Sequence, residues 1–150
     1  MNRNELKHGA AAGLLAGAST TGALIALGMR TNTASKPFNV IASHLLGPLA
    51  SNATGLVSAI TVLGVAVHLL VTAVISLLVL RIVRHRLLPL WLATATTSLL
   101  FGLVSVGIAR RGGQSLAQLF PMGDVVVYHL ILGLSLAAGI RFADPAGADD

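Results

Sequence analysis

The sequence contains no cysteine, which excludes disulfides, thiolate catalysis, cysteine-ligated zinc and iron–sulfur clusters. It also has little charge: 10% of its 150 residues are Asp, Glu, Lys or Arg, whereas a soluble domain has about 25%. Because 55% of the residues are hydrophobic, a chain this small could not cover its own surface with polar groups. We therefore expect a lipid bilayer to be its solvent.

Complete catalytic motifs are missing as well. The sequence has no glycine-rich phosphate loop before a helix, no HExxH motif and no recognisable Ser–His–Asp arrangement. The first three apolar runs carry no charged residue in their interiors, so the buried carboxylate expected of a small cation exporter is also absent. The sequence favours a protein that is not an enzyme, and it leaves metal binding undecided.

The basic residues occur in short groups that border apolar runs. The net charge is +5 and the isoelectric point is about 11.2, values that nucleic-acid-binding proteins also show. However, basic groups next to apolar runs are typical signals of membrane topology. We therefore expect a lipid bilayer, and no nucleic acid, as the partner of these charges.

Four apolar runs reach the length of about 20 residues that a membrane-spanning helix needs. They cover about 9–29, 55–80, 87–109 and 121–141, and the fourth begins at either Pro121 or Val125, because Asp124 interrupts it. A spanning segment must satisfy its own backbone hydrogen bonds, and these lengths suit helices. The predicted fold is all-α: one transmembrane domain of four helices over 1–143, followed by a disordered acidic tail over 144–150.

The stretch between the first two runs predicts a short amphipathic helix that ends near Gly47 and Pro48. It is too short to span, so we expect it to lie in the membrane interface or against the bundle. Its polar residues are Asn39, Ser43 and His44. One interpretation is that they cap the start of a helix and anchor it.

The segment from Pro37 to Gly47, with Asn39 followed by Ser43 and His44 just before a transmembrane helix, resembles a feature of small, uncharacterised bacterial four-helix membrane proteins. The resemblance covers this segment and the general layout of the spans. Leu45 and Leu46 stand where the family pattern has an aromatic residue before the glycine. It implies a bacterial membrane protein in which the three polar residues matter, and it implies no catalytic role.

Counting basic residues on the two sides of four spans predicts the orientation. One side would hold Arg3, Lys7, Arg81, Arg84, Arg86 and Arg141, and the other Arg30, Lys36, Arg110 and Arg111. The more basic side faces the cytoplasm. We therefore expect a multi-pass protein of the bacterial inner membrane with both termini in the cytoplasm.

His68 lies near the middle of the second run, where an ionisable side chain is costly and faces protein or water. Hydroxyl residues recur at helical spacing on its side of the helix: Thr54, Ser58, Thr61, Thr72 and Ser76. This stripe must face the bundle interior or a partner. His68 could hydrogen-bond another helix, ligate a haem or metal, or handle protons or substrate; Thr61, Thr72 and Ser76 complete this candidate site.

A second candidate site lies in the fourth run. Asp124 and Tyr128 are four residues apart and share a helix face, whereas His129 is rotated by about 100° and points elsewhere. If the fourth helix begins at Pro121, His68 and His129 lie at similar depth. The pair could then ligate a b-type haem, the one cofactor that the sequence allows.

Gly9, Gly13 and Gly17 form a run of small residues four apart at the start of the first span. Such runs let two helices approach closely. The neighbour is either another helix of the same chain or a helix of a partner or second copy.

Three functions follow from these observations. We favour an accessory or structural subunit of a larger bacterial membrane complex, because the chain is small and has no complete reactive constellation. The first alternative is a homo-oligomeric transporter or channel with a polar path along the His68 stripe. The second is a redox subunit that binds haem b.

Overall fold

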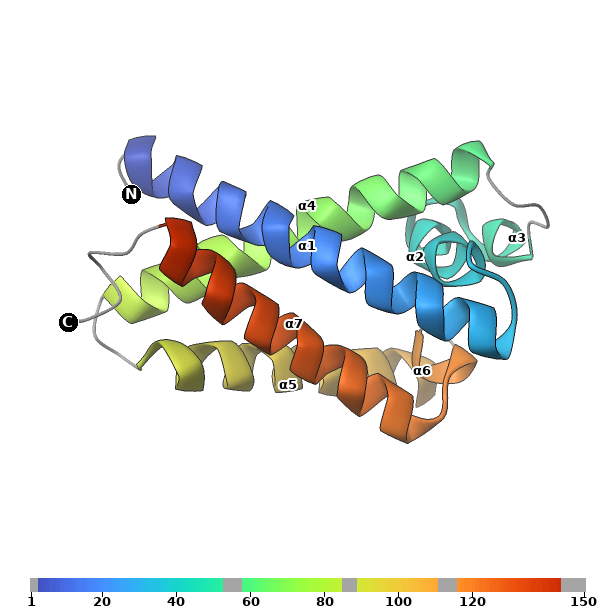
Figure 1. Ribbon diagram of the computed structural model, residues 1–150. Helices are drawn as coiled ribbons and strands as arrows, with labels where there is room; N and C mark the ends of the chain where they lie inside the picture. The colour runs from blue at the N-terminus through green and yellow to red at the C-terminus, as the bar shows by residue number, and fades with distance from the viewer. Residues whose placement is uncertain (1–2, 53–57, 85–88, 111–115, 144–150) are drawn as a thin grey trace.

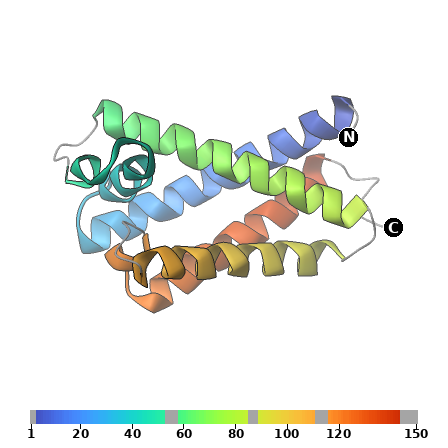
Figure 2. The ribbon, with the colours of Figure 1, turned by 180° about the vertical axis from the view of Figure 1, so that it is seen from behind.

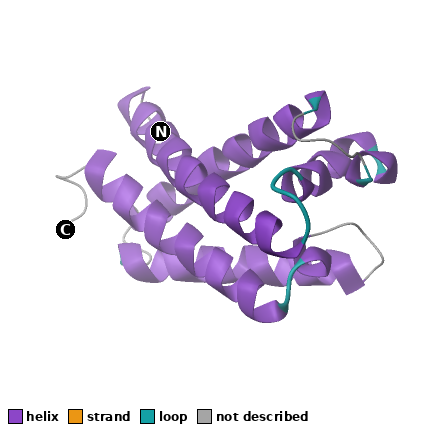
Figure 3. Cartoon of the chain, turned by 45° about the vertical axis from the view of Figure 1, so that its right-hand side comes forward, coloured by secondary structure: helices purple, strands orange, loops and turns teal. Residues whose placement is uncertain are grey.

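The computed structural model describes residues 3–52, 58–84, 89–110 and 116–143, and in these ranges all regular structure is helical (Figure 3). The elements are α1 (Arg3–Thr31), α2 (Lys36–Leu46), α3 (Pro48–Ser51), α4 (Ala59–Arg84), α5 (Leu90–Arg110), α6 (Leu116–Leu119) and α7 (Met122–Ala143). The all-α prediction is confirmed. The acidic tail over 144–150 lies outside the described residues.

Three helices, α1, α4 and α7, are long and apolar enough to cross a membrane. In α5 the apolar stretch Leu90–Val104 is shorter. Helices α1, α4, α5 and α7 run alternately up and down, so that the start of α1 and the end of α7 lie at the same end of the bundle (Figure 1).

The distribution of side chains in the bundle is the reverse of that in a soluble protein. Large apolar side chains point outward and are at least half exposed, among them Leu14, Leu70, Leu78, Leu130 and Leu134. Hydroxyl side chains are buried instead: Thr20, Thr61, Thr72, Ser76, Thr94 and Ser98. A contiguous apolar exterior of this kind is unstable in water and stable in lipid. The chain is thus built as a membrane protein.

The glycine run of α1 packs against α4 of the same chain. A Cβ atom at Gly13 would overlap the Cα atom of Ala73 and lie 2.7 Å from the carbonyl oxygen of Thr72. At Gly9 and Gly17 it would meet leucine side chains of the same helix, α4. Of the two predicted neighbours of this glycine run, the structure therefore shows a helix of the same chain.

Helix α1 meets α7 through another set of small residues. Ala12 and Ala16 are fully buried, and a Cβ atom at Gly139 would lie 2.7 Å from the carbonyl oxygen of Ala12. Near the other end of the same contact, Arg30 Nη2 lies 3.1 Å from Asp124 Oδ2. Helix α1 therefore lies between α4 and α7 and holds both.

Replacing Asp124 with Asn is expected to lower the free energy of unfolding by less than about 1 kcal/mol, because an exposed ion pair is screened by solvent. The Arg30 side chain is 64% exposed. Unfolding in detergent at low and high NaCl checks this, and the difference from the wild type should shrink in high salt. Arg30→Gln should cause the same loss; a loss that does not change with salt would contradict the ion-pair explanation.

Helix α2 lies against α4, which was one of the two predicted positions. Phe38 and Val40 are almost fully buried, and Gly64 of α4 lies so close that any Cβ there would overlap the backbone carbonyl of Phe38. Gly47, with φ of 83°, ends the helix in a conformation that favours glycine, and Pro48 follows it. The predicted end of this helix is confirmed.

Helices α4 and α5 converge where α4 ends and α5 begins, and they separate toward the end that carries α2 and α6 (Figure 2). The buried side chains described in α5, Ala93, Thr94 and Ser98, all lie in its first half. Its second half, from Leu99 to Val104, is mostly exposed. The two halves of α5 therefore have different surroundings.

The helices extend beyond the predicted spans because backbone hydrogen bonding continues into residues that are not apolar. The second helix runs to Arg84 instead of ending at Leu80, and it begins at Ala59; residues 55–57 are not described. The fourth begins at Met122, so Asp124 lies in its first turn. A carboxylate is stabilised there by the positive end of the helix dipole.

Candidate functional site

The side chain of His68 joins α4 to α1 inside the bundle. Its ring is 4% exposed, and Nε2 lies 2.9 Å from Oγ1 of Thr20. The same ring is hydrogen-bonded to the backbone of Gly17, and Tyr128 of α7 is hydrogen-bonded to the Thr20 side chain. Three helices therefore meet at a single hydroxyl group, that of Thr20.

The position of the Thr20 hydroxyl proton in this network follows from what each group can donate. Oγ1 of Thr20 lies 2.9 Å from the carbonyl oxygen of Ala16, which only accepts, so the hydroxyl donates there. Oγ1 can then accept from the Tyr128 hydroxyl, and Nε2 of His68 lies 2.9 Å from the same oxygen. The Gly17 carbonyl accepts from the His68 ring. The ring is thus held to α1 by Thr20 and Gly17, and the roles of its two nitrogens depend on the tautomer.

His129 lies two turns into α7 and is 7% exposed. Its Nδ1 lies 2.7 Å from the carbonyl oxygen of Val125, so Nδ1 carries the hydrogen and Nε2 carries the lone pair. Its ring packs edge-to-face on Tyr128, with centroids 5.0 Å apart, and its ring atoms are 3.5 Å from a Cβ built at Gly102 of α5. His129 therefore occupies the contact between α7 and α5.

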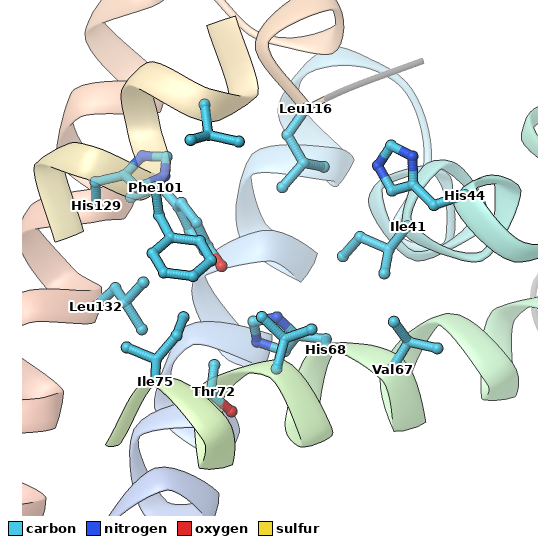
Figure 4. A pocket seen from close by; sticks show the side chains of 13 residues that line it. Ile41, His44, Val67, His68, Thr72, Ile75, Phe101, Leu116, His129 and Leu132 are labelled. Atoms are coloured by element: carbon cyan, nitrogen blue, oxygen red, sulfur yellow. The ribbon is translucent and has the colours of Figure 1, made fainter. Parts of the chain in front are cut away.

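A cavity of about 260 Å³ lies between α4 and the α5–α7 pair, where α4 and α5 separate. Figure 4 shows that it is lined from α4 by His68, Thr72 and Ile75, from α7 by His129 and Leu132, and from α5 by Phe101. Residues of α2 and α6 line the end of the cavity. The complete lining is Ile41, His44, Val67, His68, Val71, Thr72, Ile75, Phe101, Val104, Leu116, Tyr128, His129 and Leu132.

Rings are concentrated around this cavity. The sequence has one tyrosine, four phenylalanines and five histidines. The tyrosine, one of the phenylalanines and three of the histidines line the cavity. The walls therefore combine flat aromatic faces with a few hydrogen-bonding atoms, which is typical of ligand sites.

The structure places the predicted His68 stripe inside the bundle and divides it. Thr72 lines the cavity beside His68, and its hydroxyl donates to the carbonyl oxygen of Leu69. Thr61 and Ser76 are buried elsewhere along α4. Oγ1 of Thr61 donates to Oδ1 of Asn39 at 2.8 Å. Thr54 lies outside the described residues.

The three polar residues of α2 have separate roles. Asn39 accepts the hydrogen bond from Thr61 and so fixes α2 on α4. The hydroxyl of Ser43 donates to the carbonyl oxygen of Val40 within α2, and His44 is exposed at the end of the cavity. The interpretation as caps is wrong, because the helix starts after Ser35 and all three residues lie inside it.

The second predicted site is also divided. Asp124 pairs with Arg30, away from the cavity, while Tyr128 and His129 line the cavity together. His129 lies against Gly102 of α5 and Tyr128 against Thr20 of α1, so the two side chains point to different helices and still line one cavity. Adjacent residues differ by 100° around a helix, but α7 borders both α1 and α5, and the cavity extends across that angle.

Sequence reasoning missed Thr20, Phe101 and Val104. Thr20 had a signal, since Ser19, Thr20 and Thr21 interrupt the middle of an apolar run. A hydroxyl at that depth needs a partner in the bundle. Phe101 and Val104 had no signal, because apolar residues in an apolar helix are equally suited to lipid and to a cavity wall.

The cavity fits a single ring better than it fits a haem. An apolar cavity of about 150 Å³ takes up one benzene molecule, and the four pyrrole rings of haem need several times that space. In addition, Nε2 of His68 is already bonded to Thr20. No three His, Asp or Glu side chains in the described part of the chain lie close enough together to hold a metal ion.

The described fold is a helical bundle with three helices long and apolar enough to cross a membrane, and it has a cavity lined partly by aromatic and histidine rings. Comparison of the chain with protein-family models, with curated proteins and with solved structures found no match in any of the three.

Proposed function

We propose that the chain is a non-enzymatic integral membrane protein that binds a small lipophilic molecule in the cavity between α4 and α5. The observation that carries this proposal is the cavity itself, which has apolar walls and hydrogen-bonding atoms from His68, Thr72 and His129. Its volume exceeds that needed for one ring. No carboxylate is among the residues that line it in the described ranges, so neither histidine has the partner that would orient it as a catalytic base.

The route into this site leads from the lipid. Val71 of α4 and Val104 of α5 line the cavity and are 39% and 58% exposed, respectively. Both belong to helices whose outward faces are apolar, so their exposed atoms meet acyl chains. A molecule dissolved in the bilayer therefore reaches the cavity between α4 and α5 without crossing water.

The alternative of transport along the His68 stripe has less support. Thr61 contacts Asn39 of α2 and Thr72 lies against Gly17 of α1, and both are buried, as is Ser76, so the stripe is not exposed to a second copy. The geometry favours binding at one place over passage along the helix. Flux through reconstituted protein that disappears in His68→Ala would favour transport instead.

Photolabelling with a phenyl diazirine tests the binding function. In the wild type we expect saturable labelling of Tyr128 and His129, read by peptide mass spectrometry and blocked by excess naphthalene. Val104→Trp should reduce this labelling about tenfold, because the indole fills the opening. Leu103→Trp is the matched control: Leu103 is 68% exposed and does not line the cavity, so labelling should persist. Equal labelling of the two variants, or labelling that does not saturate, would overturn the proposal.

The accessory-subunit function predicted from the sequence is a second candidate, and it is favoured by α5. Leu99, Leu100 and Leu103 are each more than half exposed on the half of α5 that has separated from α4. A partner helix could cover this half. Purification in mild detergent from the native membrane tests it. A larger assembly of fixed stoichiometry would support an accessory subunit, and the protein alone or with copies of itself would contradict it.

We further propose that α5 is a fourth membrane span. Its 21 residues correspond to about 30 Å at 1.5 Å per residue, the thickness of the hydrocarbon core. Four spans leave both termini on one side, together with Arg3, Lys7, Arg81 and Arg141. The positive-inside rule assigns that side to the cytoplasm of a bacterial inner membrane. Reporter fusions at both termini test this orientation.

A further inference from the structure

We propose that the molecule bound in this cavity carries a hydroxyl group on a ring, as a lipophilic phenol or quinol does, and that this hydroxyl donates to the free imidazole nitrogen of His129. This inference rests on the binding function proposed above and specifies the chemistry of the ligand. Its basis is the direction of the hydrogen bonds already made inside the protein.

His129 supplies the clearest acceptor. Its Nδ1–H is committed to the carbonyl oxygen of Val125 at 2.7 Å, and a neutral imidazole has only one N–H. Nε2 therefore presents a lone pair, and it has no partner among the described residues. The side chain is 7% exposed and lines the cavity, so this nitrogen is accessible to a bound molecule.

His68 forms the wall of the cavity across from this acceptor. Its Nε2 contacts Oγ1 of Thr20 at 2.9 Å, so this nitrogen already has a partner within the protein. The ring is 96% buried and lines the opposite side of the cavity from His129 (Figure 4). Phe38 packs edge-to-face on this ring at 6.5 Å and holds its orientation.

The committed Nδ1–H of His129 decides whether the ligand must donate or accept a hydrogen bond at this site. A ligand that offers only carbonyl oxygens would place lone pairs against lone pairs in an apolar site, and a buried polar atom without a partner is costly. A ring hydroxyl supplies the missing hydrogen. A quinol offers such a hydroxyl, whereas the corresponding quinone offers none.

The shape of the cavity favours a ring over an acyl chain. Phe101, Tyr128 and the histidine rings present flat faces and edges that pack well on another aromatic ring. A volume of about 260 Å³ holds one substituted ring. A longer alkyl substituent would leave between Val71 and Val104 into the lipid.

Competition with a matched pair of ligands tests the inference. In the photolabelling experiment, 4-butylphenol should block labelling of the wild type at about one-tenth of the concentration that 4-butylanisole needs, because the methyl ether lacks the hydrogen. His129→Phe keeps an aromatic ring and removes the acceptor, so the ratio of the two blocking concentrations, ether to phenol, should fall toward one. His8→Phe is the matched control: His8 lies on α1 and does not line the cavity, so the ratio should stay near ten.

The outcomes separate the two proposals. If neither compound competes, the binding function fails and the inference fails with it. If both compete equally in the wild type, the cavity binds rings and only the hydroxyl inference is overturned. A preference that survives in His129→Phe would also overturn it. The ¹⁵N resonance of Nε2 of His129, recorded on the unmodified protein, should shift with the phenol and not with the ether, and this holds even if the variant folds poorly.

Discussion

Gly13→Ala is expected to lower the free energy of unfolding by about 1–3 kcal/mol, the range for overpacking a close-packed interior. The added methyl group would overlap the Cα atom of Ala73 and approach the carbonyl oxygen of Thr72 to 2.7 Å. Backbone atoms cannot rotate away as a side chain would, so α1 and α4 must separate. Unfolding in mixed detergent micelles, followed by circular dichroism, measures the loss.

Gly22→Ala is the matched control on the same helix. Gly22 is exposed, and a Cβ atom there meets nothing within 4 Å. Because alanine also has the higher helix propensity, stability should stay the same or rise slightly. If Gly13→Ala proved as stable as Gly22→Ala, the close contact between α1 and α4 would be wrong.

Thr20→Val is expected to lower the free energy of unfolding by about 1–3 kcal/mol, although the two side chains have nearly the same shape. The loss arises because Nε2 of His68 and the Tyr128 hydroxyl both lose their hydrogen-bond partner in a buried site. Thr20→Ser keeps the hydroxyl and should lose much less. The same unfolding assay compares the two variants.

A double-mutant cycle isolates the network from the packing. Tyr128→Phe removes one of the side-chain partners of Thr20, so the double variant Thr20→Val/Tyr128→Phe should be less unstable than the sum of the single changes. Strict additivity would mean that the two side chains do not interact. Thr20→Val and Thr20→Ser with equal stability would show that the hydroxyl contributes nothing.

The candidate site could be predicted only in part, and His68 shows why. Its depth in an apolar run, with hydroxyls at helical spacing, indicated that it faces the interior. The identity of its partner could not be read, because Thr20 is 48 residues away and no local pattern links the two. His129 was assigned to a different face from Tyr128, since the angle between neighbours is fixed within a helix but the extent of a cavity is not.

The sequence by itself determined the helical fold, the apolar exterior and the close approach at Gly13, because chain length, hydropathy and the absence of a side chain act locally. It also determined that the short helix ends at Gly47. Only the tertiary structure decided which helix the glycines meet, that Asp124 pairs with Arg30, and that His68 and His129 share one cavity. These depend on how helices far apart in sequence come together, and in particular on α5 separating from α4 at one end.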